Sequence, residues 1–143
     1  MLYPLIKEYS TAFSVVSASH EEIDKHNILK ASLFAMKNAV YNLNVDWKLC
    51  LIDGNLFIPE IDKKKQIPVI KGDSKSACIA AASILAKVDR DEWMTNADKL
   101  YPEYQFAKHK GYGTELHRSL LKKHGPCPIH RMSFCKNILE GKI

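Results

Sequence analysis

Two aspartates occupy positions where the sequence could bring a metal ion to a substrate. Asp53 closes the apolar run 47–53 ahead of Gly54, and Asp73 follows Gly72 at the mouth of an expected helix. In open α/β sheets the ligand site lies outside the carboxyl ends of the strands, so carboxylates that converge there could hold divalent metals and activate water against a phosphodiester. A plainer interpretation is also open, because Asp-Gly is a turn dipeptide and Asp commonly caps helices.

The second group of candidate residues is a basic loop that includes an aromatic ring. Lys108, Lys110 and Tyr112 lie in the segment 101–113, which is rich in Tyr, Lys, His and Gly. Basic side chains beside a ring, on a loop that glycine makes flexible, could bind phosphates and stack on a sugar or base. The alternative is a loop of solvated basic side chains that binds nothing.

One further cluster contains the ligand types of a zinc site, namely His124, Cys127, His130 and Cys135. Their spacing is not that of a standard zinc finger, and prolines on both sides of Cys127 stiffen the turn between them. Because the chain lacks the pattern of a disulfide scaffold, its four cysteines are expected to be buried free thiols. Zinc is the alternative.

The composition is that of an ordinary globular protein with a basic surface. At 143 residues and 46% hydrophobic, the chain is expected to form a single domain over residues 1–143 with a buried core. Its net charge of +5 suits a polyanionic partner, although many proteins without a nucleic-acid role carry as much. No apolar run approaches the roughly 20 residues of a membrane span, and residues 1–9 do not read as a signal peptide. A cytoplasmic protein is therefore expected.

The elements that must position these residues alternate between strands and helices, which predicts an α/β layer architecture. The expected elements are strands at 11–18, 47–53 and 67–70, and helices at 21–42, 74–99, 114–124 and within 129–143. Pro68 favours an edge position or the start of a strand. The stretch 77–86 is apolar almost all round, which predicts that it is buried, and 101–113 is expected to be a loop.

Several short motifs occur in the order and at about the separations of one known family, and together they cover about residues 5–135. The motifs are Glu22-Ile23-Asp24, Asn27-Ile28-Leu29, Ile52-Asp53-Gly54-Asn55, Lys71-Gly72-Asp73-Ser74-Lys75-Ser76, Ala80-Ala81-Ala82-Ser83-Ile84-Leu85-Ala86-Lys87-Val88, Arg90-Asp91, Phe106-Ala107-Lys108-His109-Lys110-Gly111-Tyr112, Gly125-Pro126 and Pro128-Ile129-His130-Arg131. None is decisive alone, but the series in register is highly specific. The chain resembles ribonuclease HII, the type 2 ribonuclease H.

This resemblance implies an RNase H-like fold in which helices flank a mixed sheet. It implies an endonuclease that cleaves RNA in RNA–DNA hybrids, including single ribonucleotides embedded in DNA. The partner would then be an RNA–DNA hybrid or a DNA duplex that contains ribonucleotides. The cofactor would be Mn²⁺ or Mg²⁺, held by four carboxylates.

The resemblance also assigns roles to particular residues of this sequence. Two of the four carboxylates fall on Asp53 and Asp73, which become the candidate catalytic and metal-binding residues. The family's ribose-sensing tyrosine falls on Tyr112. The remaining candidate substrate-binding residues are Lys75, Lys108 and Lys110. The zinc alternative weakens, since Cys127 falls where the family has a small residue in a structural turn.

The sequence departs from the family pattern near its start. The family's first strand carries an Asp-Glu pair followed by Ala-Gly-Arg-Gly, with an Asp-Ser-Lys-Lys stretch later, and neither run occurs here. The pair supplies the other two metal ligands, and the Gly-Arg-Gly backbone helps to recognise the ribose 2′-OH. We therefore expect a truncated domain without its N-terminal strands, catalytically incomplete by itself and able to self-associate, whereas the full-length family is expected to be monomeric.

Two other functions stay open. The chain could be a non-catalytic remnant of the same fold that binds nucleic acid through the shape of its backbone. It could also be an unrelated α/β metal-binding or interaction protein. An in-frame Asp-Glu-Ala-Gly-Arg-Gly run encoded upstream of Met1 would favour the ribonuclease over the remnant.

Overall fold

The computed structural model describes residues 2–141, whose contacts gather in two compact units. The first unit contains residues 2–18 and 28–88, and the second contains residues 19–27 and 89–141. Each unit has its own hydrophobic core. None of the helices within residues 2–141 is long and apolar enough to cross a membrane. That the whole chain acts as one domain stays a prediction.

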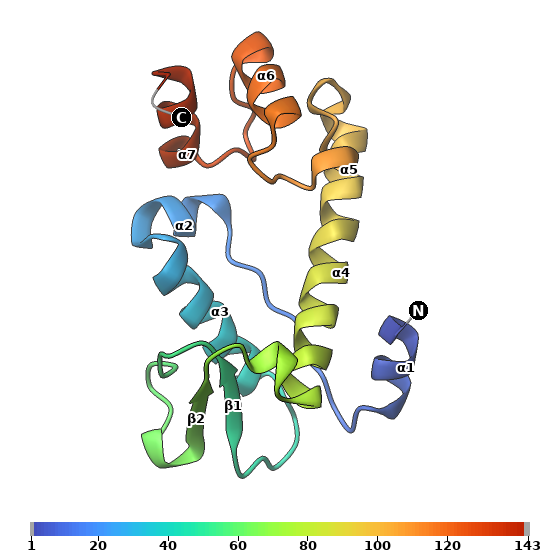
Figure 1. The fold of residues 1–143 in the computed structure, drawn as a ribbon, viewed down its shortest axis with the longest axis vertical. Helices are drawn as coiled ribbons and strands as arrows, with labels where there is room; N and C mark the ends of the chain where they lie inside the picture. The colour runs from blue at the N-terminus through green and yellow to red at the C-terminus, as the bar shows by residue number, and fades with distance from the viewer. Residues whose placement is uncertain (1, 142–143) are drawn as a thin grey trace. The chain divides into compact units, whose positions relative to one another are not determined.

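A two-stranded parallel sheet belongs to the first unit (Figure 1). Strand β1, Cys50–Asp53, pairs with strand β2, Gln66–Val69, in a register that places Asp53 beside Val69. The strands predicted at 47–53 and 67–70 are confirmed, the first with a later start and the second displaced by one residue toward the N-terminus. The described residues are therefore α/β, as predicted, and the parallel pair is consistent with an RNase H-like fold.

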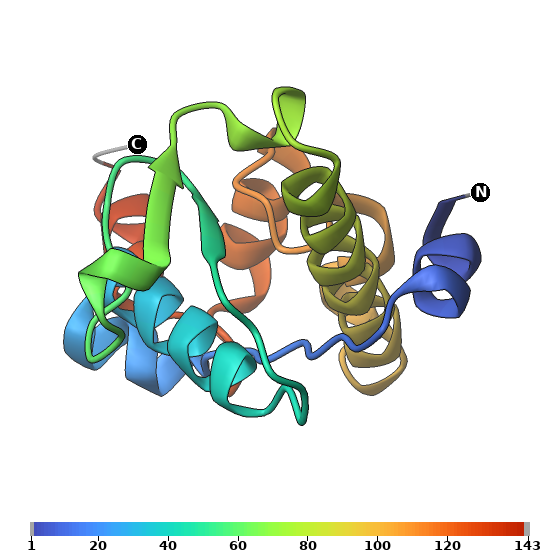
Figure 2. The ribbon, with the colours of Figure 1, turned by 90° about the horizontal axis from the view of Figure 1, so that it is seen from below.

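One face of this sheet packs into the core of the first unit. That core joins Ile52 of β1, Ile58 and Ile61 of the connection between the strands, and Val40 of helix α3, Ile28–Tyr41. Figure 2 shows α3, in cyan, lying beside the two strands. The buried Gln66 amide accepts a hydrogen bond from the Ile58 N–H at 2.7 Å and donates to the Ile61 carbonyl at 2.7 Å. These bonds fold the connection onto the sheet without leaving a buried amide unsatisfied.

The basic run in that connection is a short 3-10 helix, η1, Lys63–Lys65, whose first turn is capped by Asp62. The Asp62 carboxylate accepts a hydrogen bond from the Lys64 N–H at 2.9 Å. All three lysines are exposed.

The other face of the sheet carries exposed apolar side chains. Leu51 and Ile67 are paired across the strands and are 37% and 46% exposed. The long helix α4, Ala77–Leu100, begins in this unit, and its stretch 77–86 was predicted to be buried all round. Within that stretch Ile79 and Leu85 are buried, whereas Cys78 and others are exposed. The prediction is wrong for the described residues, because their packing covers only part of the helix circumference.

The strand predicted at 11–18 is also wrong. These residues follow helix α1, Leu2–Tyr9, as an irregular segment that pairs with neither strand of the sheet. Thr, Val and Phe favour a strand only where a neighbouring strand supplies backbone hydrogen bonds and a packed face. Among residues 2–141 no strand provides these for 11–18.

The helix predicted at 21–42 is two helices, α2, His20–His26, and α3. A capping box starts α2, because the Glu22 N–H donates to the Ser19 hydroxyl at 3.1 Å and the Ser19 N–H donates to the Glu22 carboxylate at 2.7 Å. Asn27 then ends α2 with a φ of 69°, a left-handed value through which a right-handed helix cannot continue. The apolar spacing of 21–42 gave no indication of this break.

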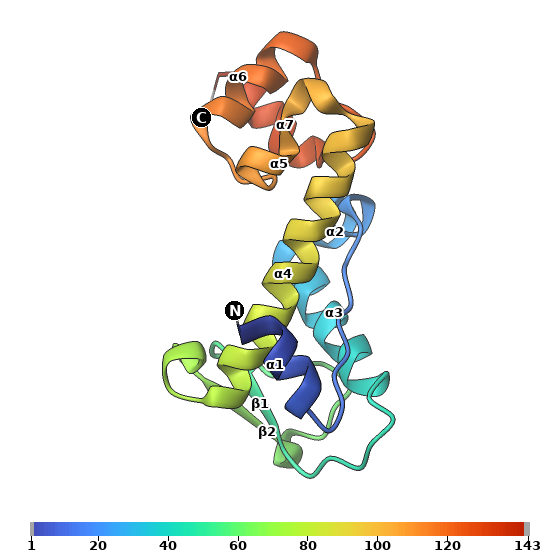
Figure 3. The ribbon, with the colours of Figure 1, turned by 90° about the vertical axis from the view of Figure 1, so that its right-hand side faces the viewer.

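The second unit is helical. Beyond the end of α4 it contains η3, Pro102–Tyr104, α5, Phe106–His109, α6, Glu115–His124, and α7, Met132–Leu139 (Figure 3). The predicted helices at 114–124 and within 129–143 are confirmed. The loop predicted at 101–113 is wrong in part, because η3 and α5 lie in it. Its order comes from Tyr104 and Phe106, which are buried and stack with ring centroids 5.5 Å apart.

Candidate active site

Asp53 is the last residue of β1, and its carboxylate is bound to the segment that carries Asp73. Asp53 Oδ1 accepts a hydrogen bond from the Gly72 N–H at 2.8 Å. The strand pairing extends past the acid, since the Gly54 N–H donates to the Val69 carbonyl at 3.0 Å. The end of β1 and the short 3-10 helix η2, Gly72–Ser74, are thereby held together.

Gly72 permits this approach because it has no side chain. A Cβ at residue 72 would lie 2.5 Å from Cδ1 of Ile79 and 3.3 Å from Oδ1 of Asp53. The first of these distances is too short for any real side chain unless Ile79 moves, and Ile79 is buried. A larger residue at this position would therefore require Ile79 of α4 to shift.

Asp73 is the middle residue of η2 and is exposed. Its Oδ1 accepts a hydrogen bond from the Ser74 N–H at 2.9 Å. Lys71, just before η2, has a left-handed φ of 54°, and the exposed Lys75 ends η2. Each of the two candidate carboxylates thus has one oxygen oriented by a backbone N–H.

This arrangement suits a hard divalent cation, because carboxylate oxygens are the ligands that Mg²⁺ and Mn²⁺ prefer. Asp53 and Asp73 have the ligand chemistry of such a site, and the Asp53 carboxylate is bonded to the N–H of the residue directly before Asp73. Nowhere in residues 2–141 do three or more His, Cys, Asp or Glu side chains form a group that could hold a metal ion. That both acids bind one metal centre stays a prediction.

The candidate substrate-binding residues are divided between the units. Lys75 belongs to the first unit with the two aspartates, whereas Lys108, Lys110 and Tyr112 belong to the second. The Lys110 ammonium donates to the Thr95 hydroxyl at 2.6 Å, which ties it to α4.

The other loop lysine is also engaged within the protein. The Lys108 ammonium donates to the Gln105 side chain at 2.6 Å. Both lysines therefore lie against the protein surface, and a phosphate would have to compete with these bonds. Tyr112 differs from them, because its ring is 53% exposed.

Arg90 was not predicted to touch this loop. Its guanidinium lies over the Tyr112 ring, 5.5 Å from the centroid, and donates to the Lys110 carbonyl at 3.2 Å. A cation over an aromatic face restrains the ring and brings positive charge beside it. No sequence signal links Arg90 to Tyr112, since they meet only through the packing of the loop on α4.

Three buried histidines behind the loop were also missed as a group. His109, His117 and His130 are at most 5% exposed. Burial, and then the charge of His117, lower the pKa of His130 from 6.5 to about 4, and burial lowers the pKa of His117. One signal was available, since His117 is four residues before Leu121 and shares the buried face of α6.

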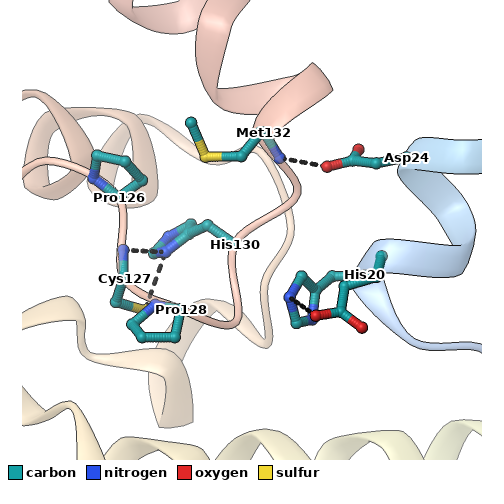
Figure 4. Close-up of a pocket in the computed structure, with 8 residues that line it drawn as sticks. His20, Asp24, Pro126, Cys127, Pro128, His130 and Met132 are labelled. Carbon is teal, nitrogen blue, oxygen red and sulfur yellow. Dashed lines mark hydrogen bonds and ion pairs between the residues drawn. The ribbon is translucent and has the colours of Figure 1, made fainter.

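The zinc cluster allowed by the sequence is not formed by the described residues. Nδ1 of His130 accepts a hydrogen bond from the Cys127 N–H at 3.0 Å and lies 3.0 Å from the Cys127 sulfur (Figure 4). Burial raises the pKa of the Cys127 and Cys135 thiols, which disfavours the thiolate that zinc requires. All four cysteines are free, as expected, but only Cys135 is buried, since Cys50 and Cys127 are half-buried and Cys78 is exposed.

The hollow beside this turn is closed on its other side by α2 (Figure 4). Asp24 of α2 accepts a hydrogen bond from the Met132 N–H at 2.6 Å and further bonds from the N–H and hydroxyl of Ser133. These bonds, the Ser133 hydroxyl first, lower the pKa of Asp24. Asp24 therefore serves as the N-terminal cap of α7.

Comparison with known proteins identifies the family of this chain. Residues 1–137 match the sequence profile of the family described as Ribonuclease HII. A ribonuclease HII of Caldanaerobacter subterraneus subsp. tengcongensis is 49% identical over 140 residues, which cover 98% of this chain and 57% of that protein. Those of Endomicrobium trichonymphae and Clostridioides difficile are 49% and 50% identical over 94% and 96% of this chain, and 63% and 53% of their own lengths. The chain thus spans about half to two thirds of these relatives, and it belongs to the ribonuclease HII family.

Proposed function

We propose that the chain takes part in metal-dependent hydrolysis of RNA in RNA–DNA hybrids, including single ribonucleotides within DNA. The observation that carries the proposal is the hydrogen bond from the Gly72 N–H to Asp53, because Gly72 directly precedes Asp73, the other candidate carboxylate. The name Ribonuclease HII, which the relatives share, supports a ribonuclease reaction. The basic net charge of +5 suits a nucleic-acid substrate.

In this proposal Asp53 and Asp73 hold Mn²⁺ or Mg²⁺ through the carboxylate oxygens that the backbone leaves available. A bound divalent ion would supply a more acidic water and neutralise charge on the phosphate. The Gly72 N–H keeps the Asp53 carboxylate oriented before any ion arrives. Tyr112 would meet the sugar of the ribonucleotide, because its ring is exposed and is backed by Arg90.

The chain by itself is expected to cleave slowly or not at all. The family uses four carboxylates, of which this sequence supplies Asp53 and Asp73, and a two-metal reaction needs ligands on both ions. A separate peptide carrying the Asp-Glu-Ala-Gly-Arg-Gly run should then raise the rate.

The first test is Mn²⁺ binding, measured by calorimetry on the 143-residue chain. Asp53→Asn and Asp73→Asn should each weaken the affinity at least about tenfold, since even outer-sphere changes cost about 10–100-fold. Asp46→Asn, the same change on an exposed acid of the first unit, should leave the affinity unaltered. Equal affinities in all four proteins would remove the metal site from the proposal.

The second test is cleavage of a labelled DNA duplex with one ribonucleotide, with the all-DNA duplex as its control. Turnover by the chain alone that Asp53→Asn abolishes would mean that another acid completes the site. Binding of both duplexes without cleavage, even with the peptide present, would favour a non-catalytic nucleic-acid-binding role.

A further inference from the structure

The buried imidazoles of the second unit form one connected network. His109 and His117 stack with ring centroids 4.2 Å apart, and Nε2 of His117 lies 3.1 Å from Nε2 of His130. Their exposed fractions are 5%, 3% and 5% in the order His109, His117, His130. Water is therefore largely excluded, and each ring nitrogen must find its partner within the protein.

The partners of the network fix which nitrogen of each ring carries the hydrogen. Nδ1 of His130 accepts from the Cys127 N–H at 3.0 Å, so Nε2 of His130 is the donor toward His117. Nε2 of His117 must then accept, and its Nδ1–H donates to the Tyr112 carbonyl at 2.9 Å. Each imidazole is neutral in this arrangement, and no ring can exchange tautomers alone.

His109 holds the same loop from the other side. Its Nδ1 accepts from the Gly111 N–H at 3.2 Å, and its Nε2–H donates to the Tyr104 carbonyl at 2.7 Å. The His109 carbonyl accepts from the Tyr112 N–H at 2.8 Å. Both backbone groups of Tyr112 are therefore bound by histidines, its N–H through the main chain of His109 and its carbonyl through the ring of His117.

We propose that His117, with its tautomer set by His130, is a positioning residue that fixes the backbone of Tyr112 and thereby the place of its exposed ring. The role assigned to that ring rests on the function proposed above. The loop needs such a hold, because Lys110 and Gly111 have left-handed φ values of 51° and 76° that an unrestrained loop would readily leave. The Thr114 N–H also donates to the Tyr112 carbonyl, at 2.8 Å, so His117 supplies one of two donors.

The competing interpretation is that His117 merely fills space between His109 and His130. Three variants separate the two interpretations. His117→Asn places an amide N–H near the position of Nδ1 and keeps the bond to Tyr112, whereas His117→Leu keeps apolar volume and removes the bond. His124→Leu, at the exposed end of the same helix, is the matched control.

The first readout needs no substrate and uses the whole chain. Long-range ¹H–¹⁵N spectra at neutral pH should show hydrogen on Nδ1 of His117 and on Nε2 of both His109 and His130. The Tyr112 amide and ring signals should shift in His117→Leu, and should stay close to wild type in His117→Asn and His124→Leu. Hydrogen on Nε2 of His117, or an unmoved Tyr112 in His117→Leu, would overturn the proposal. If His117→Leu does not fold, the tautomers and His117→Asn still decide it.

The second readout is discrimination between a DNA duplex with one ribonucleotide and the all-DNA duplex. His117→Leu should reduce the ratio of the two affinities about threefold to tenfold, the range expected for one hydrogen bond, with little change in all-DNA binding. His117→Asn should restore most of the ratio. Full discrimination in His117→Leu, together with its loss in Tyr112→Ala, would overturn the positioning role alone. If Tyr112→Ala leaves the ratio unchanged, or no duplex binds, the function proposed for Tyr112 fails, and the spectra still decide whether His117 positions it.

Discussion

The two units hold their candidate residues by different means. In the first unit, Asp53 and Asp73 are oriented by backbone N–H groups at the end of a two-stranded sheet. One face of that sheet exposes Leu51 and Ile67 by 37% and 46%. In the second unit Tyr112 is held by buried imidazoles, next to a core whose members Leu121, Cys135 and Ile138 are all 0% exposed.

The candidate metal ligands and the fully buried core residues therefore lie in different units. In the proposed function the carboxylates would need access to ions and substrate, and they lie in the unit whose sheet has an exposed apolar face. Tyr112 would need a fixed ring, and it lies in the unit that contains the fully buried Leu121, Cys135 and Ile138. Paired apolar side chains left exposed on a sheet are typical contact or aggregation surfaces, so self-association through the first unit stays an expectation.

The largest effect that would test this comparison is a matched pair of leucine truncations. Leu121→Ala should lower the free energy of unfolding by about 2–5 kcal/mol, because it empties a fully buried site. Leu51→Ala should cost less than about 1 kcal/mol, because its side chain is already partly in water. Urea unfolding at two protein concentrations measures both. A large cost for Leu51→Ala that grows with concentration would show that this face is covered by a second copy in solution.

The next prediction tests how closely the first unit is packed around Gly72 and Asp53. Gly72→Ala should cost about 1–3 kcal/mol, since its Cβ would lie 2.5 Å from Cδ1 of Ile79. It should also weaken Mn²⁺ binding, because relief of the clash moves the N–H that orients Asp53. Ile79→Val removes the clashing methyl group, so the double variant should recover part of the loss. A double-mutant cycle in urea that shows strict additivity would contradict this contact.

The fold was predictable wherever a local pattern decides it. The apolar run ending at Asp53 and the spacing of α6 were sufficient for a strand and a helix. The misses have two causes. Residues 11–18 lack a neighbouring strand, and the break at Asn27 is a local backbone conformation with no apolar signature. For the candidate site, residue type and position singled out the two aspartates and the loop of Tyr112, and the family resemblance assigned their roles. Arg90 and the histidine network were missed, because their contacts join separate segments of the chain.

A third effect uses pH to probe the second unit. The folded state depresses the pKa of His130 to about 4 and lowers that of His117, while the unfolded chain has about 6.5 for both. As pH falls from about 6.5 toward 4 the unfolded state takes up protons first, so the free energy of unfolding should fall, by at most about 1.4 kcal/mol per pH unit for each group. The titratable and charged groups that face this pair include His109, Tyr104, Cys127 and Arg131.

The control for this dependence replaces one histidine at a time. His130→Gln should flatten the slope between pH 7 and 4, whereas His124→Gln, a change at an exposed histidine of α6, should not. Asp24 contributes in a lower window, because its depressed pKa makes stability fall only as pH drops below its usual 3.8. Chemical unfolding across this range measures the slope. An unchanged slope in His130→Gln would mean that His130 is not neutral and buried in the folded chain.

The smallest expected effect concerns the exposed side chain of Tyr112 in the second unit. Arg90 lies over Tyr112 at 5.5 Å and also donates to the Lys110 carbonyl. A cation–π contact at an exposed site contributes about 0.5–1 kcal/mol, so Arg90→Ala should lower the free energy of unfolding by about that amount. Arg90→Lys keeps the charge but loses the planar group that stacks on the ring, and it should recover less than half of the loss. Lys99→Ala, at the exposed end of α4, should change little. Tyr112 ring signals that move equally in the Lys99 and Arg90 variants would mean that Arg90 does not restrain the ring, and that the histidines behind the loop hold Tyr112 unaided.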